Sequence, residues 1–488
     1  MSGSKRYDLV VVGGGTGGLL SALIAAGTGA RVALLERDRT GGDCLWTGCV
    51  PSKSLIAAAG LAHRMRNADS VGLTPVEPVV DLARVMDRVW AAIHTIEPQD
   101  SPERLRAAGI DVLAATGEFT GPGRILAGED ELRFRSAIVA TGSRPDVPPI
   151  PGLRNAEPLT SDTVWSLREL PDRLLVLGGG PIGCELAQAF GRLGSNVTLV
   201  ETADELLLKE EPRARQLIAE RLGAEGVDLR LGRRASQVRP AAREHDGGET
   251  RNELLLDGPA GTETVPFDRV LVATGRRPRT EGLGLERVGV EVGAGGAVTV
   301  DRRLRTTGRR IFAVGDVTGL LPFTHVAAHH ARVATPNALF HTRTSVSETL
   351  PWVTFTDPEI GHVGLTEDEA RSKWGERAII AEHDYADLDR AITEGKAYGF
   401  AKLVADPHGR LIGATVAAPG GGEAIAELTA WVSRGEKIAA LSRSVHAYPT
   451  LAEGPARADD EHLAARYSTP RMRAALRPVL ATLRLLER

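Results

Sequence analysis

A short apolar strand that runs into a glycine-rich turn and then a small-residue helix occurs twice in this chain of 488 residues, and this repeat constrains the fold most strongly. Both turns have the spacing GxGxxG, with Gly13, Gly15 and Gly18 in the first and Gly178, Gly180 and Gly183 in the second. Such a turn brings the backbone and a helix N-terminus close to a pyrophosphate. The repeat predicts two similar α/β domains, each of which binds a dinucleotide.

The segments that follow each turn strengthen this prediction. In each unit a second strand ends in an acidic residue, Glu36 or Glu201, where a carboxylate can accept a hydrogen bond from a ribose hydroxyl. Farther along, an apolar strand ends in Ala-Thr-Gly, with Thr141 and Gly142 in the first unit and Gly275 in the second. The duplication is therefore visible at both ends of each unit.

Composition excludes several classes of function. A net charge of -4 and 4% aromatic residues argue against nucleic-acid binding. Three cysteines are too few for a disulfide-stapled secreted scaffold, so a reducing compartment, the cytoplasm, is expected. The N-terminus lacks the pattern of a signal peptide, and glycines interrupt the apolar stretch 9–30, which favours strand, turn and helix over a membrane span.

Two of the three cysteines, Cys44 and Cys49, lie in the stretch 41–54, GGDCLWTGCVPSKS. The pair lacks the four ligands of a structural zinc site and no histidine cluster accompanies it, so no metal site is expected. Two thiols near a helix start can form a disulfide, and the helix N-terminus favours a thiolate. Reversible redox chemistry is therefore the favoured interpretation, and two packed core cysteines are the alternative.

Residues 41–53 resemble the active-site signature of the FAD-dependent pyridine nucleotide-disulfide oxidoreductases, which include dihydrolipoamide dehydrogenase, glutathione reductase and mercuric reductase. The resemblance continues in order through both glycine turns, both Ala-Thr-Gly turns and Gly315-Asp316, over about the first 460 residues. It implies an α/β protein with two Rossmann-like dinucleotide-binding domains and a C-terminal α+β dimerisation domain. The expected parts are an FAD-binding domain (1–150 and 281–345), an NAD(P)-binding domain (151–280), an interface domain (346–465) and a basic amphipathic tail (466–488).

The resemblance also implies roles for individual residues. Cys49 would lie against the flavin, Cys44 would meet the substrate, and Lys53 with Glu185 would lie beside flavin N5. The residues implied to bind FAD are Gly13, Gly15, Gly18, Glu36, Lys53, Thr141, Gly142 and Asp316. Those implied to bind the nicotinamide dinucleotide are Gly178, Gly180, Gly183, Glu201 and Gly275. The carboxylate of Glu201 repels a 2'-phosphate, which favours NADH over NADPH.

One segment departs from the family pattern. The disulfide reductases carry His-Pro-Thr followed by Glu, and this histidine acts as an acid-base group from the partner subunit. Here the segment places Tyr448 at the histidine position, with His446 two residues earlier and Glu453 at the glutamate position. A phenol is a poorer proton shuttle than imidazole at neutral pH. His446 is either a substitute for the missing histidine or a packing residue. A homodimer is also expected, because in the family this segment acts on the site of the partner subunit.

The expected function is transfer of electrons from NAD(P)H through FAD and the Cys44–Cys49 disulfide to a small-molecule acceptor. A small disulfide, a quinone and a metal ion remain open, and Tyr448 shifts the weight toward the last two. Mercury is disfavoured because no cysteine follows Cys184, which is expected to be a packed helix residue. The alternative is a flavin-containing redox sensor or binding protein without efficient turnover.

The tail has leucines on one side and arginines on the other, from Pro470 to Arg488. We expect it to pack on its own protein or on the partner subunit, with contact to an anionic membrane surface as the alternative. Pro478 is expected to break the helix.

Overall fold

The computed structural model describes residues 6–239, 252–258 and 261–486. The chain divides into two compact units. Unit 1 comprises Met1–Arg66, Glu77–Asp204 and Glu225–Ser347, and unit 2 comprises Asn67–Val76, Glu205–Ala224 and Glu348–Arg488. Both glycine turns lie in unit 1, and the C-terminal segment lies in unit 2. The segment Glu205–Ala224 groups with unit 2 although it lies within the range expected for the NAD(P)-binding domain; the boundary between the two nucleotide-binding domains stays a prediction.

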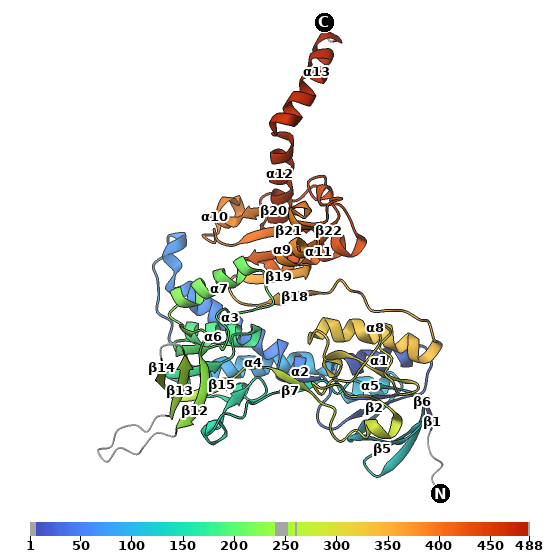
Figure 1. Ribbon diagram of the computed structural model, residues 1–488. Helices are drawn as coiled ribbons and strands as arrows, with labels where there is room; N and C mark the ends of the chain where they lie inside the picture. Colours follow the sequence, from blue (N-terminus) through green and yellow to red (C-terminus); the bar gives the residue numbers. More distant parts are fainter. Residues whose placement is uncertain (1–5, 240–251, 259–260, 487–488) are drawn as a thin grey trace, which may run out of the picture. The chain divides into compact units, whose positions relative to one another are not determined.

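Unit 1 contains two lobes. The one that carries the first glycine turn, called the first lobe below, is built on a parallel sheet (Figure 1). In spatial order its parallel strands are β3 (Ile110–Ala114), β2 (Val32–Glu36), β1 (Arg6–Val12), β6 (Asp130–Val139) and β17 (Ile311–Ala313). The helices α1 (Thr16–Gly27) and α8 (Thr324–Phe340) pack beside each other against Leu9 and Val11 of β1. On the other face, β4 (Gly117–Gly121) and β5 (Arg124–Ala127) contribute Phe119 and Ile125 to the core. Apolar residues on β1 alternate between the two faces, as expected for a strand that is buried on both sides.

The second part of unit 1, called the second lobe below, repeats this plan. Its parallel strands, in spatial order, are β11 (Asp228–Arg230), β10 (Asn196–Val200), β9 (Arg173–Leu177), β15 (Arg269–Val272) and β8 (Leu159–Thr160). The helix after its glycine turn is α6 (Pro181–Leu193). An antiparallel sheet of β12 (Arg234–Arg239), β13 (Asn252–Gly258) and β14 (Gly261–Phe267) packs on the second lobe through Leu254 and Phe267.

The two glycine turns have the same backbone geometry. Gly13 has φ +105° and Gly178 has φ +109°, values that favour glycine. A Cβ atom at Gly13 would lie 2.4 Å from the carbonyl oxygen of Ala140, and one at Gly178 would lie 2.5 Å from that of Ala273. The predicted repeat is therefore confirmed at the level of individual backbone contacts.

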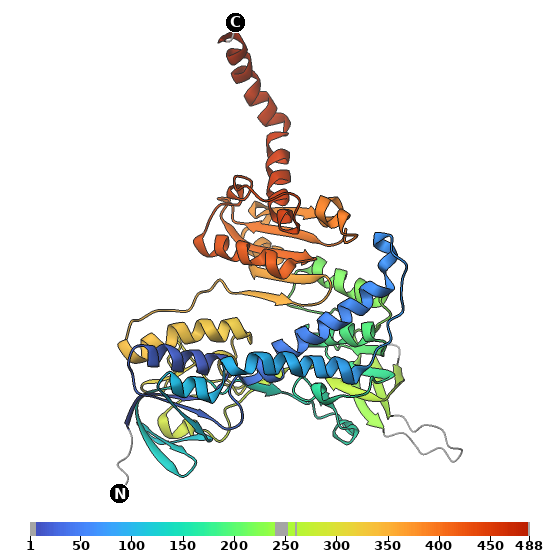
Figure 2. The same ribbon diagram turned by 180° about the vertical axis from the view of Figure 1, so that it is seen from behind.

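Four α-helices lie between β2 and β3 in the sequence. They are α2 (Gly42–Trp46), α3 (Cys49–Arg66), α4 (Leu82–Ile96) and α5 (Pro102–Ala107). In unit 1, α3 packs against α4 and also against α6, so it joins the two lobes (Figure 2). A short two-stranded sheet of β7 (Ser143–Pro145) and β16 (Arg276–Pro278) joins the segments after the two Ala-Thr-Gly turns.

Unit 2 contains the antiparallel sheet and helices expected of an α+β domain. The strand order is β18 (Pro351–Thr354), β19 (Glu359–Gly364), β22 (Leu411–Ala418), β21 (Phe400–Ala405) and β20 (Ile379–Asp384). The helices are α7 (Pro212–Ala224), α9 (Glu367–Trp374), α10 (Asp389–Thr393), α11 (Gly421–Arg434) and α12 (Gly454–Tyr467). The core lies between the sheet and α11, where Ile425 and Leu428 pack against Val416.

A buried ion cluster holds the segment before α7 in unit 2. The Nζ atom of Lys402 on β21 lies 2.8 Å from Glu211, 2.7 Å from Glu367 and 3.2 Å from Glu382. The side chains of Lys402 and Glu211 are 7% and 2% exposed. Burial alone would lower the pKa of Lys402, but the hydrogen bonds that it donates to Glu211 and Glu367 outweigh burial and raise that pKa. The lysine therefore remains charged in the core.

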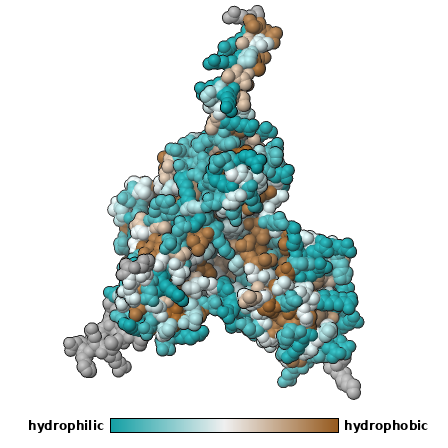
Figure 3. All heavy atoms as spheres, viewed as in Figure 1, coloured by the Kyte–Doolittle hydropathy of each residue, from teal (hydrophilic) through white to brown (hydrophobic). Residues whose placement is uncertain are grey.

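The C-terminal helix α13 runs from Pro470 to Leu486, so the expectation that Pro478 breaks it is wrong. Proline at this position removes one backbone donor, the one that would bond the carbonyl of Ala474, and water can replace it on an exposed helix. No residue of α13 is buried, and Figure 3 shows both hydrophobic and hydrophilic side chains on it. None of the described helices is long and apolar enough to cross a membrane.

Candidate redox site

The two cysteines lie on either side of the tight connection between α2 and α3. Cys44 is in the middle of α2 and Cys49 is the first residue of α3. At Gly48 a Cβ atom would lie 2.9 Å from the carbonyl oxygen of Asp43, so the connection requires glycine. Cys44 is half-buried, Cys49 is exposed, and both are free thiols. Each thiol changes the acidity of the other.

The two thiols have different acidities. The hydrogen bond from Cys44 lowers the pKa of Cys49 to about 6, although partial desolvation of the thiolate opposes this. The hydroxyl of Thr324, 3.3 Å from the Cys49 sulfur, and the charge of Lys53 lower it further. The same hydrogen bond and burial raise the pKa of Cys44. At neutral pH the reduced pair therefore holds its thiolate at Cys49 and its proton at Cys44.

A lysine-glutamate pair lies next to this thiolate. Lys53 is one helical turn after Cys49 on α3, and its Nζ atom lies 2.8 Å from Oε2 of Glu185 on α6. The Glu185 side chain is 8% exposed. Because α3 and α6 come from the two lobes, this ion pair places a fixed positive charge where the lobes meet.

Each glycine turn is held by the acidic residue that the sequence assigned to ribose binding. The amide of Gly14 donates to Oε2 of Glu36 at 2.6 Å, and the amide of Gly179 donates to Oε2 of Glu201 at 2.6 Å. Burial opposes ionisation of Glu201, but hydrogen bonds from Ala203, Gly179 and Thr202 outweigh it and lower its pKa. Glu201 is therefore a fixed carboxylate at the end of β10.

The helices after the turns begin without a side-chain cap. Gly15 and Gly180 occupy the N-cap positions of α1 and α6 with nearly identical backbone angles, φ −78° and −76°. A Cβ atom at Gly18 would lie 1.8 Å from the carbonyl oxygen of Gly13, so the helix packs directly on the turn. The uncapped N–H groups, the absent side chains and the acid beside each turn fit the diphosphate and ribose of a dinucleotide.

The threonine of each Ala-Thr-Gly turn hydrogen-bonds to the segment that follows the other turn. The hydroxyl of Thr141 donates to the carbonyl of Arg279 at 2.6 Å, and the hydroxyl of Thr274 donates to that of Asp146 at 3.1 Å. Gly142 and Gly275 have positive φ, +68° and +149°. Thr141 and Gly142 therefore help to join the two lobes.

Asp316 lies in the 3-10 turn Gly315–Thr318, after β17. Its Oδ2 atom accepts a hydrogen bond of 2.7 Å from Ser143, and burial raises its pKa. The amide of Gly315 donates to Nδ1 of the buried His330 at 3.2 Å, which fixes the turn from the α8 side.

Sequence reasoning missed three residues next to the cysteines: Thr324, Ser143 and Arg276. Thr324 contacts the Cys49 sulfur, and Arg276 donates hydrogen bonds to Ser143 and to the carboxylate of Asp43. Arg276 directly follows the second Ala-Thr-Gly turn and Ser143 directly follows the first, which is the signal that was available. Cys184 is buried on α6, as expected, and its thiol donates to the carbonyl of Gly179.

The residues expected to supply acid-base chemistry lie in unit 2, and each has another partner there. The hydroxyl of Tyr448 donates to Oδ2 of Asp389 at 2.8 Å, and this hydrogen bond raises the pKa of the phenol. The Tyr448 side chain is 65% exposed. A phenol that already donates to a carboxylate is a weaker proton donor to a substrate than a free phenol.

His446 and Glu453 do not contact Tyr448 through any described hydrogen bond. The Nε2 atom of His446 lies 3.2 Å from a carboxylate oxygen of Glu427, and its Nδ1 atom lies 3.1 Å from the carbonyl of Ser444. Glu453 accepts a hydrogen bond of 3.0 Å from the amide of Thr450 and so caps its own 3-10 turn. Both residues are therefore held in local structural contacts in this chain.

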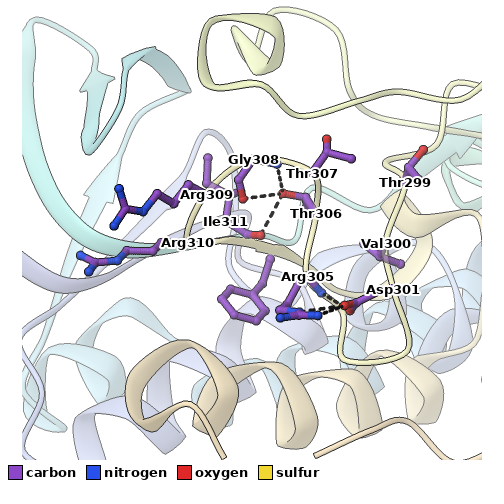
Figure 4. A pocket seen from close by; sticks show the side chains of 11 residues that line it. Thr299, Val300, Asp301, Arg305, Thr306, Thr307, Gly308, Arg309, Arg310 and Ile311 are labelled. Carbon is purple, nitrogen blue, oxygen red and sulfur yellow. Dashed lines mark hydrogen bonds and ion pairs between the residues drawn. The ribbon is translucent and has the colours of Figure 1, made fainter. Parts of the chain in front are cut away.

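A separate open cavity of about 460 Å³ lies in unit 1, near β17 (Figure 4). It is lined by residues 299–301 and 305–312, and none of the predicted redox or dinucleotide residues is among them. The guanidinium of Arg305 in it is paired with Asp301 at 2.6 Å, and Thr306 bonds the backbone of the same loop. Within residues 6–239, 252–258 and 261–486, no group of three or more His, Cys, Asp or Glu could hold a metal ion.

Comparison with known families covers most of the chain. The pyridine nucleotide-disulphide oxidoreductase family matches residues 7–331, and its dimerisation domain matches residues 350–458. This chain belongs to the pyridine nucleotide-disulphide oxidoreductase family. Members of this family bind FAD and use NAD(P), and the dimerisation domain indicates a homodimer. The chain is therefore an FAD-dependent NAD(P)H oxidoreductase of the disulfide type.

Similar curated proteins carry two different names. A mercuric reductase from Streptomyces lividans is 37% identical over 458 residues, which cover 92% of this chain and 94% of that protein. A dihydrolipoyl dehydrogenase from Haloferax volcanii is 35% identical over 462 residues, with 91% and 94% coverage.

Solved structures are similar over nearly the whole chain. The Cu(II) complex of the HOCl-induced flavoprotein disulfide reductase RclA from Escherichia coli has a TM-score of 0.82 and 27% identity, covering 94% of this chain and 99% of that one. LpdA from Mycobacterium tuberculosis has a TM-score of 0.83 and 31% identity, again with 94% and 99% coverage.

Proposed function

We propose that this oxidoreductase passes electrons from NADH to FAD, and from there either through the Cys44–Cys49 pair to a metal ion or directly to a quinone, rather than to a small disulfide. The observation that carries the choice of acceptor is the hydrogen bond from Tyr448 to Asp389. A disulfide acceptor needs a proton for its leaving thiolate, and Tyr448 occupies the position of the histidine that serves this purpose in the disulfide reductases.

The residues of the first lobe fit FAD. The uncapped N-terminus of α1 would hold the diphosphate, Glu36 would face the adenosine ribose, and the buried carboxyl of Asp316 would face the ribityl chain. The Lys53–Glu185 pair would lie beside the ring. When bound, FAD supplies the two-electron chemistry that links nicotinamide oxidation to disulfide reduction.

The second lobe fits a nicotinamide dinucleotide, and Glu201 favours NADH. Its carboxylate is held in place by the amides of Gly179 and Ala203 and stays ionised because its pKa is lowered. A fixed negative charge at the ribose accepts from a 2'-hydroxyl and repels a 2'-phosphate.

The cysteines would cycle between disulfide and dithiol. Reduction consumes NADH and the disulfide and yields NAD⁺ and the singly deprotonated dithiol, with the thiolate at Cys49 and the proton at Cys44. Oxidation of this thiol–thiolate pair by two Cu(II) ions returns the disulfide and yields two Cu(I) ions and one proton. No proton passes to the acceptor in this step, so no histidine is required at position 448.

Similar proteins support a metal ion as acceptor. One relative is named a mercuric reductase, and one similar structure is a Cu(II) complex. Transfer to a metal ion requires contact between the ion and a thiol, and the family resemblance assigns this contact to Cys44. A quinone would instead take electrons directly from the flavin, without Cys44.

An acceptor panel tests this proposal. Steady-state oxidation of NADH and of NADPH is measured with Cu(II), a water-soluble quinone and oxidised lipoamide, for wild type, Cys44→Ser and Tyr448→His. We expect NADH to be preferred, with faster turnover of Cu(II) or the quinone than of lipoamide. Loss of the Cu(II) activity in Cys44→Ser identifies transfer through the dithiol, and retention of the quinone activity identifies transfer from the flavin.

The Tyr448→His variant is the matched comparison, because it restores the histidine of the disulfide reductases. We expect it to raise lipoamide turnover and to leave Cu(II) turnover unchanged. Efficient wild-type turnover of lipoamide, equal to or above that of both other acceptors, would overturn the proposed acceptor class.

A further inference from the structure

Arg276 makes a set of contacts that the proposed mechanism does not use. Its guanidinium is 18% exposed and lies just after the second Ala-Thr-Gly turn. Nε donates to the hydroxyl of Ser143 at 2.7 Å, Nη2 to the carbonyl of Ser143 at 3.2 Å, and Nη1 to the hydroxyl of Ser161 at 3.0 Å. Nη2 also donates to the carboxylate of Asp43. Every nitrogen of the guanidinium therefore has a defined partner.

These contacts connect the region where the two lobes meet to the helix that carries Cys44. Asp43 directly precedes Cys44 in α2, which has only five residues; its N-cap Gly41 and its first residue Gly42 both have positive φ. So short a helix derives little stability from its own backbone hydrogen bonds. Its orientation therefore depends on side-chain contacts, and the ion pair with Arg276 is one that reaches it from the second lobe.

The same arginine is linked to the flavin side of the site. Ser143 accepts from Arg276 Nε and donates to Oδ2 of Asp316 at 2.7 Å. The path of contacts thus runs from Cys44 through Asp43, Arg276 and Ser143 to Asp316. Its two ends are the thiol expected to meet the acceptor and the carboxyl expected to meet the ribityl chain.

The charges around Cys44 give Asp43 a second effect. An unbalanced carboxylate beside a thiol disfavours the thiolate, and Arg276 balances it. The other charged groups near this network are Asp162, 3.8 Å from Arg276 Nη1, and Arg279, 3.6 Å from Asp162. The charges that act on the partner thiol Cys49 are those of Lys53, which lowers its pKa, and Glu185, which raises it.

We propose that Arg276 is a positioning residue for Cys44: through Asp43 it orients the short helix that carries this thiol and balances the charge beside it. The inference rests on the proposed redox role of the Cys44–Cys49 pair. It predicts that removing the positive and the negative partner has opposite electrostatic effects on Cys44, whereas a purely structural ion pair would give the same effect from either side.

The test is the pH dependence of alkylation of Cys44 in the reduced holoenzyme, read by mass spectrometry of the Cys44 peptide. Arg276→Gln leaves Asp43 unbalanced, so the midpoint of the alkylation profile should rise by about half a pH unit or more. Asp43→Asn leaves Arg276 unbalanced, so the midpoint should fall by a similar amount. The double variant Asp43→Asn with Arg276→Gln should return close to wild type.

Two further variants keep the test sharp. Arg277→Gln changes the neighbouring, half-exposed arginine on β16, which pairs with Asp146 and not with Asp43, and should leave the profile unchanged. Arg276→Lys keeps the charge but loses the planar set of contacts, so its midpoint should stay near wild type while the alkylation rate changes. Shifts of the same sign in Arg276→Gln and Asp43→Asn, or none in either, would overturn the inference.

The reductant separates this inference from the proposed function. Each enzyme is reduced once with dithiothreitol and once with NADH. If only dithiothreitol exposes the two thiols, the proposed electron path from NADH fails, and the comparison of the variants in dithiothreitol still decides the role of Arg276.

Discussion

At the scale of single residues, the structure gives the two cysteines different acidities, which their spacing in the sequence does not reveal. Three groups stabilise a thiolate at Cys49: the thiol of Cys44, the hydroxyl of Thr324 and the charge of Lys53. Cys44 keeps its proton and lies beside the Asp43–Arg276 pair. The sequence predicts the pair and Lys53, but not Thr324 or Arg276, which are 275 residues from Cys49 and 233 residues from Asp43.

The acidity of Cys49 predicts a pH profile. Its pKa in the reduced pair is lowered to about 6, so the thiolate is present above that pH and is lost as the pH falls through it. In the two-electron-reduced holoenzyme, long-wavelength thiolate-flavin absorbance should therefore disappear with a midpoint near pH 6.

Replacing Lys53 by Gln removes one of the charges that stabilise the thiolate, and the midpoint should move upward. Replacing the exposed Arg31 by Gln, just before β2, where it pairs with Asp8, is a surface control that should leave it unchanged. A midpoint at or above the ordinary thiol value of about 8.5 in wild type would contradict the assignment of the thiolate.

At the scale of elements, the glycine turns were predictable because their backbone conformation requires glycine at fixed positions of the sequence. Gly13 and Gly178 have positive φ and touch a neighbouring carbonyl, so only glycine fits. The grouping of Glu205–Ala224 with unit 2 was not predictable, because it depends on Glu211 meeting Lys402, a residue 191 positions away. Local patterns do not encode such distant contacts.

The buried ion cluster predicts a large stability effect. Lys402→Met leaves Glu211 buried without its cation, and removing one partner of a buried pair costs about 3–5 kcal/mol. Urea unfolding of the holoenzyme should show this loss. The variant Lys373→Met, on the exposed part of α9, is the control; equal stabilities of Lys402→Met and wild type would show that the cluster does not hold unit 2 together.

Removing the C-terminal helix, in contrast to replacing Lys402, should have little effect on stability. No residue of α13 is buried, so a chain ending at Tyr467 should keep its stability within about 0.5 kcal/mol and its NADH-reduction rate. A larger loss of stability in the truncated dimer would indicate that α13 packs on the partner subunit, as the sequence leads us to expect. Flotation of the full-length protein with anionic liposomes, lost on truncation, would instead support contact with a membrane surface.

At the scale of the whole molecule, family membership, cofactors and the general reaction follow from motifs that occur in a fixed order along the chain. The acceptor does not, because under our proposal it depends on a segment of unit 2 in which Tyr448 departs from the family pattern. Tyr448, His446 and Glu453 occupy a recognisable segment, yet each is bonded to a neighbour that the sequence pattern does not indicate. These contacts, together with tyrosine in place of histidine at position 448, lead to our prediction about the class of acceptor.

The central claim is that electrons from NADH reach the Cys44–Cys49 pair. The most direct measurement is anaerobic stopped-flow reduction of the oxidised holoenzyme by one equivalent of NADH, followed across the visible spectrum, for wild type and Cys49→Ser. The account predicts a long-wavelength thiolate-flavin absorbance in wild type that is absent in Cys49→Ser. Full bleaching of the flavin in wild type without this absorbance, identical to the variant, would contradict it.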